Sequence, residues 1–92
     1  MQKAIEHIIV KKYGLSIVHE MHTKQGRFDI YIKELDLIVE VKLTSESWNI
    51  EKVAEQKARY EKIAETIVVS LDGKPEGWVT PKELFQVIES KI

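Results

Sequence analysis

The chain begins with apolar residues at helical spacing. Within residues 2–12, the side chains of Ile5, Ile8 and Ile9 recur on one side of a helix. Gly14 follows at a position where a left-handed residue commonly ends a helix. The pattern therefore predicts a first helix over residues 2–12.

Three segments with the composition of β-strands come next. Residues 15–23 and 27–33 flank a turn around Gly26, and residues 37–43 follow a second turn at residues 34–36. In the second and third segments, apolar residues alternate with polar ones, which is typical of strands with two different faces. The three segments predict an antiparallel meander.

The second half of the chain returns to helical patterns. Residues 50–65 favour a helix with a stripe that includes Val53 and Tyr60. Residues 66–71 form a continuous apolar run, which predicts a buried strand parallel to the one before the helix. A capping box at residues 80–83 starts a last helix that runs to the C-terminus. The fold class predicted is α/β, with a mixed central sheet flanked by helices.

Composition and charge restrict the number of domains, the kind of metal site and the presence of membrane segments. The chain has 92 residues, 14 basic and 15 acidic, and a net charge of −1, so we expect a single domain over residues 1–92 without the overall basicity of many nucleic-acid binders. It has no cysteine, which restricts any metal site to oxygen and imidazole ligands. Charges interrupt the apolar residues at the start of the chain, so neither a signal peptide nor a membrane span is expected. We expect a cytoplasmic protein with no membrane partner.

The second turn predicts which residues of the two following strands oppose each other. A two-residue turn at residues 34–35 makes paired numbers sum to 69, which places Asp29 opposite Glu40, with Lys42 on the same face. Opposed side chains have Cβ atoms ~4.5–5.5 Å apart, so two carboxylates there repel each other unless a cation or proton lies between them. In the alternative interpretation, this is a solvated sheet face on which Asp29 pairs with Lys42. The other, aliphatic face is expected to carry Phe28, Ile30, Ile32, Leu37, Val39 and Val41.

These residues form a longer pattern. Residues 26–29 read Gly-Arg-Phe-Asp, residues 40–42 read Glu-Val-Lys, and Gln56 precedes Tyr60 by four positions. The pattern resembles the PD-(D/E)XK nuclease superfamily and is most similar to its RecB-like branch. Phe28 stands where that superfamily often has proline, while the G-x-x-D of RecB-like members is present. The resemblance covers roughly residues 5–71 and implies a restriction-endonuclease-like αβββαβ core, here followed by an additional helix.

The resemblance also implies a catalytic site. Asp29 and Glu40, with the backbone carbonyl of Val41, would bind Mg²⁺ or Mn²⁺, and Lys42 would orient or deprotonate the attacking water. Members of the superfamily often carry a glutamate on the first helix, and Glu6 is the carboxylate available there as a further catalytic and metal-binding residue. A solvent-facing charge is the alternative for Glu6.

Gln56 and Tyr60 complete the set of expected catalytic residues. They lie one helical turn apart, so both can face one site. The resemblance implies that Gln56 contacts the catalytic lysine or the nucleic-acid backbone and that Tyr60 contacts a sugar, base or phosphate. A buried polar pair between helix and sheet is the alternative.

Two further groups of residues invite a chemical interpretation. His19 and His22 lack the spacing of a helical zinc motif and would point to opposite faces of a strand. If paired numbers in the first hairpin sum to 49, Glu20 faces Asp29 and is either an accessory metal ligand or an acid that contacts the ligands from outside.

Aromatic and basic residues near the expected site are also candidates for DNA contact. Trp48 and Trp78 are expected in loops, either as hydrophobic plugs or, for Trp48, stacked on a base. A phosphate-binding rim, or plain solvated surface, is expected of seven basic residues: Lys11, Lys12, Lys24, Arg27, Lys52, Lys57 and Arg59.

The sequence therefore predicts a small Mg²⁺-dependent DNA nuclease. A Holliday-junction resolvase-type endonuclease and a non-cleaving nucleic-acid-binding module with the same fold are the alternatives. We also expect a homodimer, because two subunits would hold DNA better than one small domain. The last helix would cover the sheet and contribute to the interface with apolar residues spread beyond one stripe: Leu84, Phe85, Val87, Ile88 and Ile92. The alternative is a monomer in which this helix broadens its contact with the core.

Overall fold

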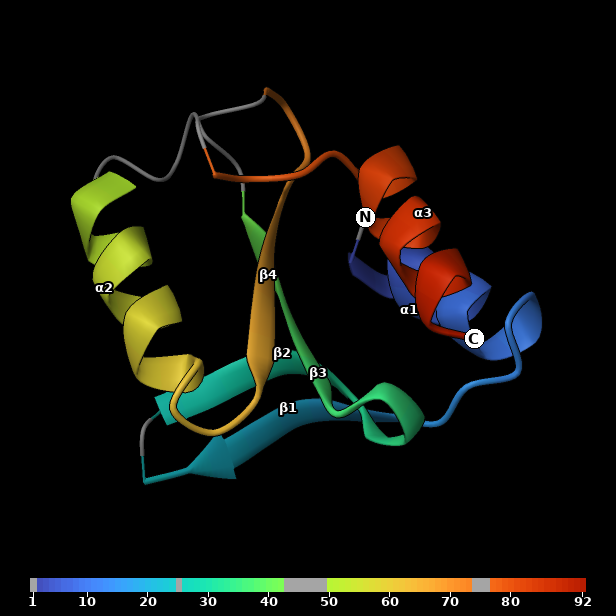
Figure 1. Ribbon diagram of the computed structural model, residues 1–92, viewed down its shortest axis with the longest axis horizontal. Helices are drawn as coiled ribbons and strands as arrows, with labels where there is room; N and C mark the ends of the chain where they lie inside the picture. Colours follow the sequence, from blue (N-terminus) through green and yellow to red (C-terminus); the bar gives the residue numbers. More distant parts are fainter. Residues whose placement is uncertain (1, 25, 43–49, 74–76) are drawn as a thin grey trace.

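The chain folds into a four-stranded sheet between two helical layers (Figure 1). The computed structural model describes residues 2–24, 26–42, 50–73 and 77–92. Its elements are α1 (Gln2–Lys11), β1 (Ile17–Thr23), β2 (Gly26–Ile32), the 3₁₀ turn η1 (Lys33–Leu35), β3 (Leu37–Lys42), α2 (Ile50–Tyr60), β4 (Glu65–Ser70) and α3 (Pro81–Lys91). Helix α2 covers one face of the sheet, and α1 and α3 lie together on the other. None of the helices within the described ranges is long and apolar enough to cross a membrane.

The sheet has the mixed topology that the sequence predicts. Its strand order is β1-β2-β3-β4, with antiparallel pairing on both sides of β2 and parallel pairing between β3 and β4. Tyr31 pairs with Ile38, so paired numbers of β2 and β3 sum to 69. His19 pairs with Ile30, so those of β1 and β2 sum to 49. Both registers considered from the sequence are therefore present.

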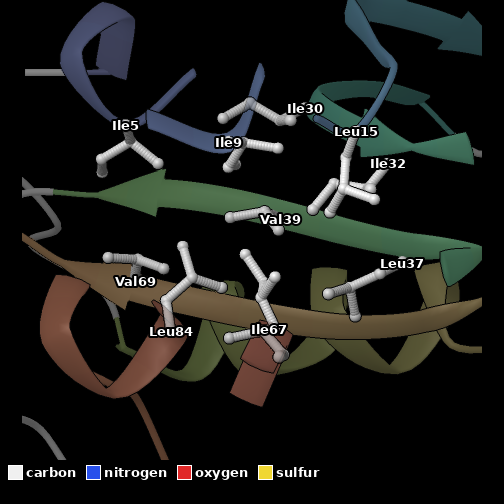
Figure 2. Close-up of a cluster of buried hydrophobic side chains, with 11 residues drawn as sticks. Ile5, Ile9, Leu15, Ile30, Ile32, Leu37, Val39, Ile67, Val69 and Leu84 are labelled. Atoms are coloured by element: carbon white, nitrogen blue, oxygen red, sulfur yellow. The ribbon is translucent and has the colours of Figure 1, made fainter. Parts of the chain in front are cut away.

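The larger core fills the space between the sheet and the α1–α3 layer (Figure 2). Each fully buried aliphatic side chain in it contributes roughly 1.5–3 kcal/mol relative to an exposed one, so this layer is the main source of stability. The cluster joins residues from both helices, the segment after α1 and three strands: Ile5, Ile9, Leu15, Ile30, Ile32, Leu37, Val39, Ile67, Val69, Leu84 and Ile88.

The opposite face of the sheet is also buried, because α2 covers it. Phe28, Ile38 and Tyr60 pack together there, so the expectation that Phe28 belongs to the aliphatic face with Ile30 is wrong. Glu20, which would oppose Asp29 in the register, has a φ of 51°. Phe28 packs on the α2 side with Met21, its partner across the β1–β2 hairpin, and the register is the same on both sides of Glu20.

Helix α2 is shorter than its composition indicates. It ends at Tyr60 and not at residue 65, and a turn is closed by hydrogen bonds from the amides of Ile63 and Ala64 to the Tyr60 carbonyl. Strand β4 then begins at Glu65, which lies beside Leu37 at the start of β3. Helical composition continues past Tyr60, but the parallel pairing with β3 requires the chain to enter the sheet at Glu65.

The last helix uses most of its apolar residues within its own chain. Leu84 and Ile88 are buried, and Phe85 packs against the same core with its ring centroid 6.1 Å from that of Tyr13. Ile92, at the end of the chain, is exposed. The broad apolar surface of α3 thus has a partner inside the monomer, and the homodimer stays a prediction.

Candidate functional site

Asp29 and Glu40 meet where β2 and β3 separate. The β1–β2 hairpin runs across the direction of β3 and β4 (Figure 1), and in the described chain the paired residues of β2 and β3 end at Ile30 and Val39. Beyond that point, side chains replace strand pairing. The Asp29 amide donates to Glu40 Oε2 at 2.8 Å, and the Val41 amide donates to Asp29 Oδ2 at 2.9 Å. The predicted proximity of the two carboxylates is confirmed.

Glu40 is the buried member of this pair, with 1% of the residue exposed. Burial, and then the neighbouring Asp29 carboxylate, raise the pKa of Glu40 from 4.5 to about 7. Lys42 acts in the opposite direction, with its Nζ 3.6 Å from Glu40 Oε1 and its side chain 26% exposed. The solvated-face interpretation is therefore wrong for Glu40. A buried carboxyl that titrates near neutral pH stands beside an amine that reaches solvent.

Tyr60 holds this region together from α2. It is 1% exposed, its ring packs edge-on against Phe28 with centroids 4.5 Å apart, and its hydroxyl donates to the Arg27 carbonyl at 3.2 Å. Burial, and then the Glu40 carboxylate, raise the pKa of Tyr60, while a hydrogen bond with Gln56 opposes the shift. A ring so buried has no surface on which to stack a base, so the structure favours the packing interpretation for Tyr60.

Gly26 is the residue that allows Tyr60 to approach. Its φ is 129°, and a Cβ added there would lie 2.8 Å from the Tyr60 hydroxyl oxygen. The glycine of the Gly-Arg-Phe-Asp segment and the tyrosine of the helix are thus two halves of one contact, which anchors the backbone just before Asp29. Sequence spacing alone does not reveal this link.

Replacing Gly26 with alanine is expected to lower the free energy of unfolding by about 2–3 kcal/mol, because backbone strain and the contact with Tyr60 add. Chemical denaturation measures this loss. Gly14→Ala is the matched control, since Gly14 has a φ of 66° but no atom within 4 Å of an added Cβ. Equal losses in the two variants would contradict the additional cost expected at Gly26.

Glu6 lies against β1. Its Oε2 is 2.8 Å from His19 Nδ1, and the Glu6 side chain is 14% exposed. The interpretation of Glu6 as a solvent-facing charge is therefore replaced by a side-chain hydrogen bond between α1 and β1. A catalytic or metal-binding role for Glu6 stays a prediction.

The neighbouring residues of β1 form an exposed charged cluster. Glu20 Oε1 lies 3.8 Å from His19 Nε2 and 3.9 Å from Arg27 Nη1. The register that places Glu20 opposite Asp29 is present. The contacts of the Glu20 carboxylate nevertheless go to a histidine and an arginine on the surface.

The two tryptophans have different outcomes. Trp78 is buried with Val53 and Val68 beneath α2, which confirms the hydrophobic plug. Trp48, considered for base stacking, lies outside the described residues.

Ser70 is a buried polar residue beside Lys42 that no motif in the sequence singles out. It pairs with Lys42 across the parallel strands, is 1% exposed, and has a hydroxyl without a hydrogen-bond partner in the described structure. A serine at the end of the apolar run of residues 66–71 was the available signal, because parallel pairing places the ends of adjacent strands side by side.

Asp29, Glu40 and the backbone of Val41 are the groups that could hold a metal. Among the described residues, no three His, Asp or Glu side chains gather closely enough to do so. Two adjacent carboxylates nevertheless fit Mg²⁺ or Mn²⁺, since these ions take few protein ligands and keep water and phosphate as the others. A cation at this position would favour the ionised form of Glu40, which burial and Asp29 disfavour.

No protein-family model matches the chain, and neither a curated protein nor a solved structure matches it. The resemblance to PD-(D/E)XK nucleases therefore rests on the pattern of residues 26–29, 40–42, 56 and 60. The structure itself establishes an α/β fold with a four-stranded mixed sheet and flanking helices.

Proposed function

We propose that the chain is a metal-dependent deoxyribonuclease of the PD-(D/E)XK type. The observation that carries the proposal is the cluster of Asp29, Glu40 and Lys42 at the point where two strands diverge. Two carboxylates there provide oxygen ligands for a hard cation, and the lysine provides a positive charge next to them. The αβββαβ order of elements and the residue pattern support the same reaction.

The residues have distinct roles in this proposal. Mg²⁺ or Mn²⁺, bound by Asp29, Glu40 and the Val41 carbonyl, would supply Lewis-acid activation of a phosphodiester and of water. Lys42 orients the attacking water, helps to remove its proton and neutralises charge that grows on the phosphate. Because Lys42 is partly exposed, it can reach a substrate that lies on the surface.

Gln56 and Tyr60 act on the site from α2. Gln56 lines the same cavity as Lys42, so it is placed to contact either the lysine or the substrate backbone. Tyr60 is a positioning residue, because it fixes the backbone of Arg27 and Gly26 ahead of Asp29.

A cleavage assay tests the proposal. Single-stranded, duplex, flap and four-way-junction DNA are each incubated with Mg²⁺, Mn²⁺ or EDTA, and we expect cleavage with either metal and none in EDTA. The form that is cut separates a RecB-like exonuclease from a junction-resolving endonuclease. Absence of cleavage of all four forms with both metals would contradict the proposal.

Asp29→Ala is expected to weaken Mg²⁺ binding at least about tenfold, because even loss of an outer-shell partner costs 10–100-fold. Isothermal titration calorimetry measures the change. Glu61→Ala removes an exposed carboxylate just beyond α2 and should leave the affinity unchanged. Equal binding by Asp29→Ala and the wild-type protein would refute the metal site.

A second candidate is a nucleic-acid-binding module that does not cut. Both carboxylates accept backbone amides where the strands separate, so they stabilise the fold without any metal. Salt-sensitive DNA binding with no cleavage in the same assay would favour this candidate.

A further inference from the structure

Positive charge gathers in a cavity beside Lys42. The cavity has a volume of about 450 Å³ and is lined by Lys42, Lys52, Val53, Glu55, Gln56 and Arg59. Three cationic side chains face one carboxylate, although the whole chain carries a net charge of −1. This local excess of positive charge favours an anionic ligand.

The cations are spaced for more than one anionic group. Lys52 and Arg59 are seven residues apart on α2, which is two helical turns or about 10 Å along the helix axis. Glu55 and Gln56 lie between them on the same side, as their place in the cavity wall shows. A single phosphate is too small to span this distance, whereas phosphates linked in series along a strand can contact both ends.

Other basic residues considered from the sequence are placed elsewhere. Arg27 lies 3.9 Å from Glu20, and Lys12 lies over the ring of Tyr13 at 5.4 Å from its centroid. Lys57 belongs to α2 but is not part of the cavity wall. Of the seven basic residues considered from the sequence, Lys52 and Arg59 are the two that line this cavity with Lys42.

We infer that the α2 wall of this cavity is a binding subsite for the phosphodiester backbone of a single nucleic-acid strand. Lys52 and Arg59 each contact a phosphate of the strand. The phosphate that is cleaved lies beside Lys42, and this part of the inference rests on the proposed nuclease function. Lys52 and Arg59 lie about 10 Å apart along one helix, so both can contact phosphates of the same strand. Glu55 opposes binding by repelling the strand.

Binding in EDTA tests this subsite without cleavage. The probe is a fluorescent thymidine oligonucleotide of about 12 nucleotides, within the range that one single-strand-binding domain covers. We expect Lys52→Gln and Arg59→Gln each to weaken binding about fivefold at 0.1 M salt and to reduce the slope of log K against log salt by about 0.7. Glu55→Gln should strengthen binding. Lys82→Gln removes an exposed lysine of α3, on the far side of the sheet, and should change neither quantity. Circular dichroism verifies that each variant is folded.

The outcomes separate the subsite from the nuclease proposal. Selective weakening by Lys52→Gln and Arg59→Gln supports the subsite even if no DNA is cut with Mg²⁺. Wild-type affinity and salt slope in both variants, or a loss no larger than that of Lys82→Gln, would overturn the subsite even if DNA is cut. Tighter binding of a duplex of the same length would also overturn it.

Discussion

Lys42→Ala is expected to reduce the rate of DNA cleavage by about 10²–10⁴-fold, the range typical of a lost general acid–base group. The Lys42 amine lies 3.6 Å from Glu40 Oε1 and also reaches solvent. It can therefore act both beside a proposed metal ligand and on a substrate at the surface. Alanine removes both the charge and the titratable nitrogen at this position. Single-turnover cleavage with Mg²⁺ measures the loss.

Two controls distinguish catalysis from folding. Lys82→Ala removes an exposed lysine of α3, on the far side of the sheet, and should leave the rate unchanged. The stability of Lys42→Ala should lie within about 1 kcal/mol of wild type at pH 5, where Glu40 is protonated, and fall further at pH 8, where Glu40 loses its nearby cation. Full activity of Lys42→Ala would remove Lys42 from the site. Unfolding of the variant at pH 5 would make the lysine structural.

The stability of the metal-free protein is expected to fall as the pH rises from about 5 to 8. Glu40 has a raised pKa of about 7 in the folded protein, against 4.5 for the ordinary group. Below pH 4.5 Glu40 is protonated in both the folded and the unfolded state, so its full contribution to the free energy of unfolding is present. Between these values the folded state binds more protons, and the free energy of unfolding falls by up to about 3 kcal/mol. Urea denaturation in EDTA across this range measures the change.

Glu40→Gln is the control for this titration. The amide keeps an oxygen that can accept the hydrogen bond from the Asp29 amide, but it cannot ionise. The difference in stability between the two proteins should therefore grow in favour of Glu40→Gln from pH 5 to pH 8. Parallel curves for wild type and variant would show that Glu40 does not titrate in this window. Added Mg²⁺ at pH 8 should stabilise the wild-type protein more than the variant.

The carboxylate pair and Tyr60 differ in how far the sequence predicts their positions. Asp29 and Glu40 follow from alternation and a short turn, because a one-residue slip would move apolar residues off their buried face. Tyr60 shows the opposite case. Its spacing from Gln56 is visible in the sequence, but its contact with Gly26 joins residues that are far apart in the chain.

Local pattern alone determined the order of elements, the register between β2 and β3, the parallel placement of β4 and the capping box of α3. It offered the register between β1 and β2 only as one possibility, which the structure selected. These features depend on the two-residue and 3.6-residue periods of strands and helices and on the chemistry of turns, which neighbouring residues specify. The tertiary structure decided the burial of Glu40, the face of Phe28, the partner of Glu6 and the cavity beside α2. Each of these depends on which distant element covers a given surface, and that is decided only when the helices pack on the sheet.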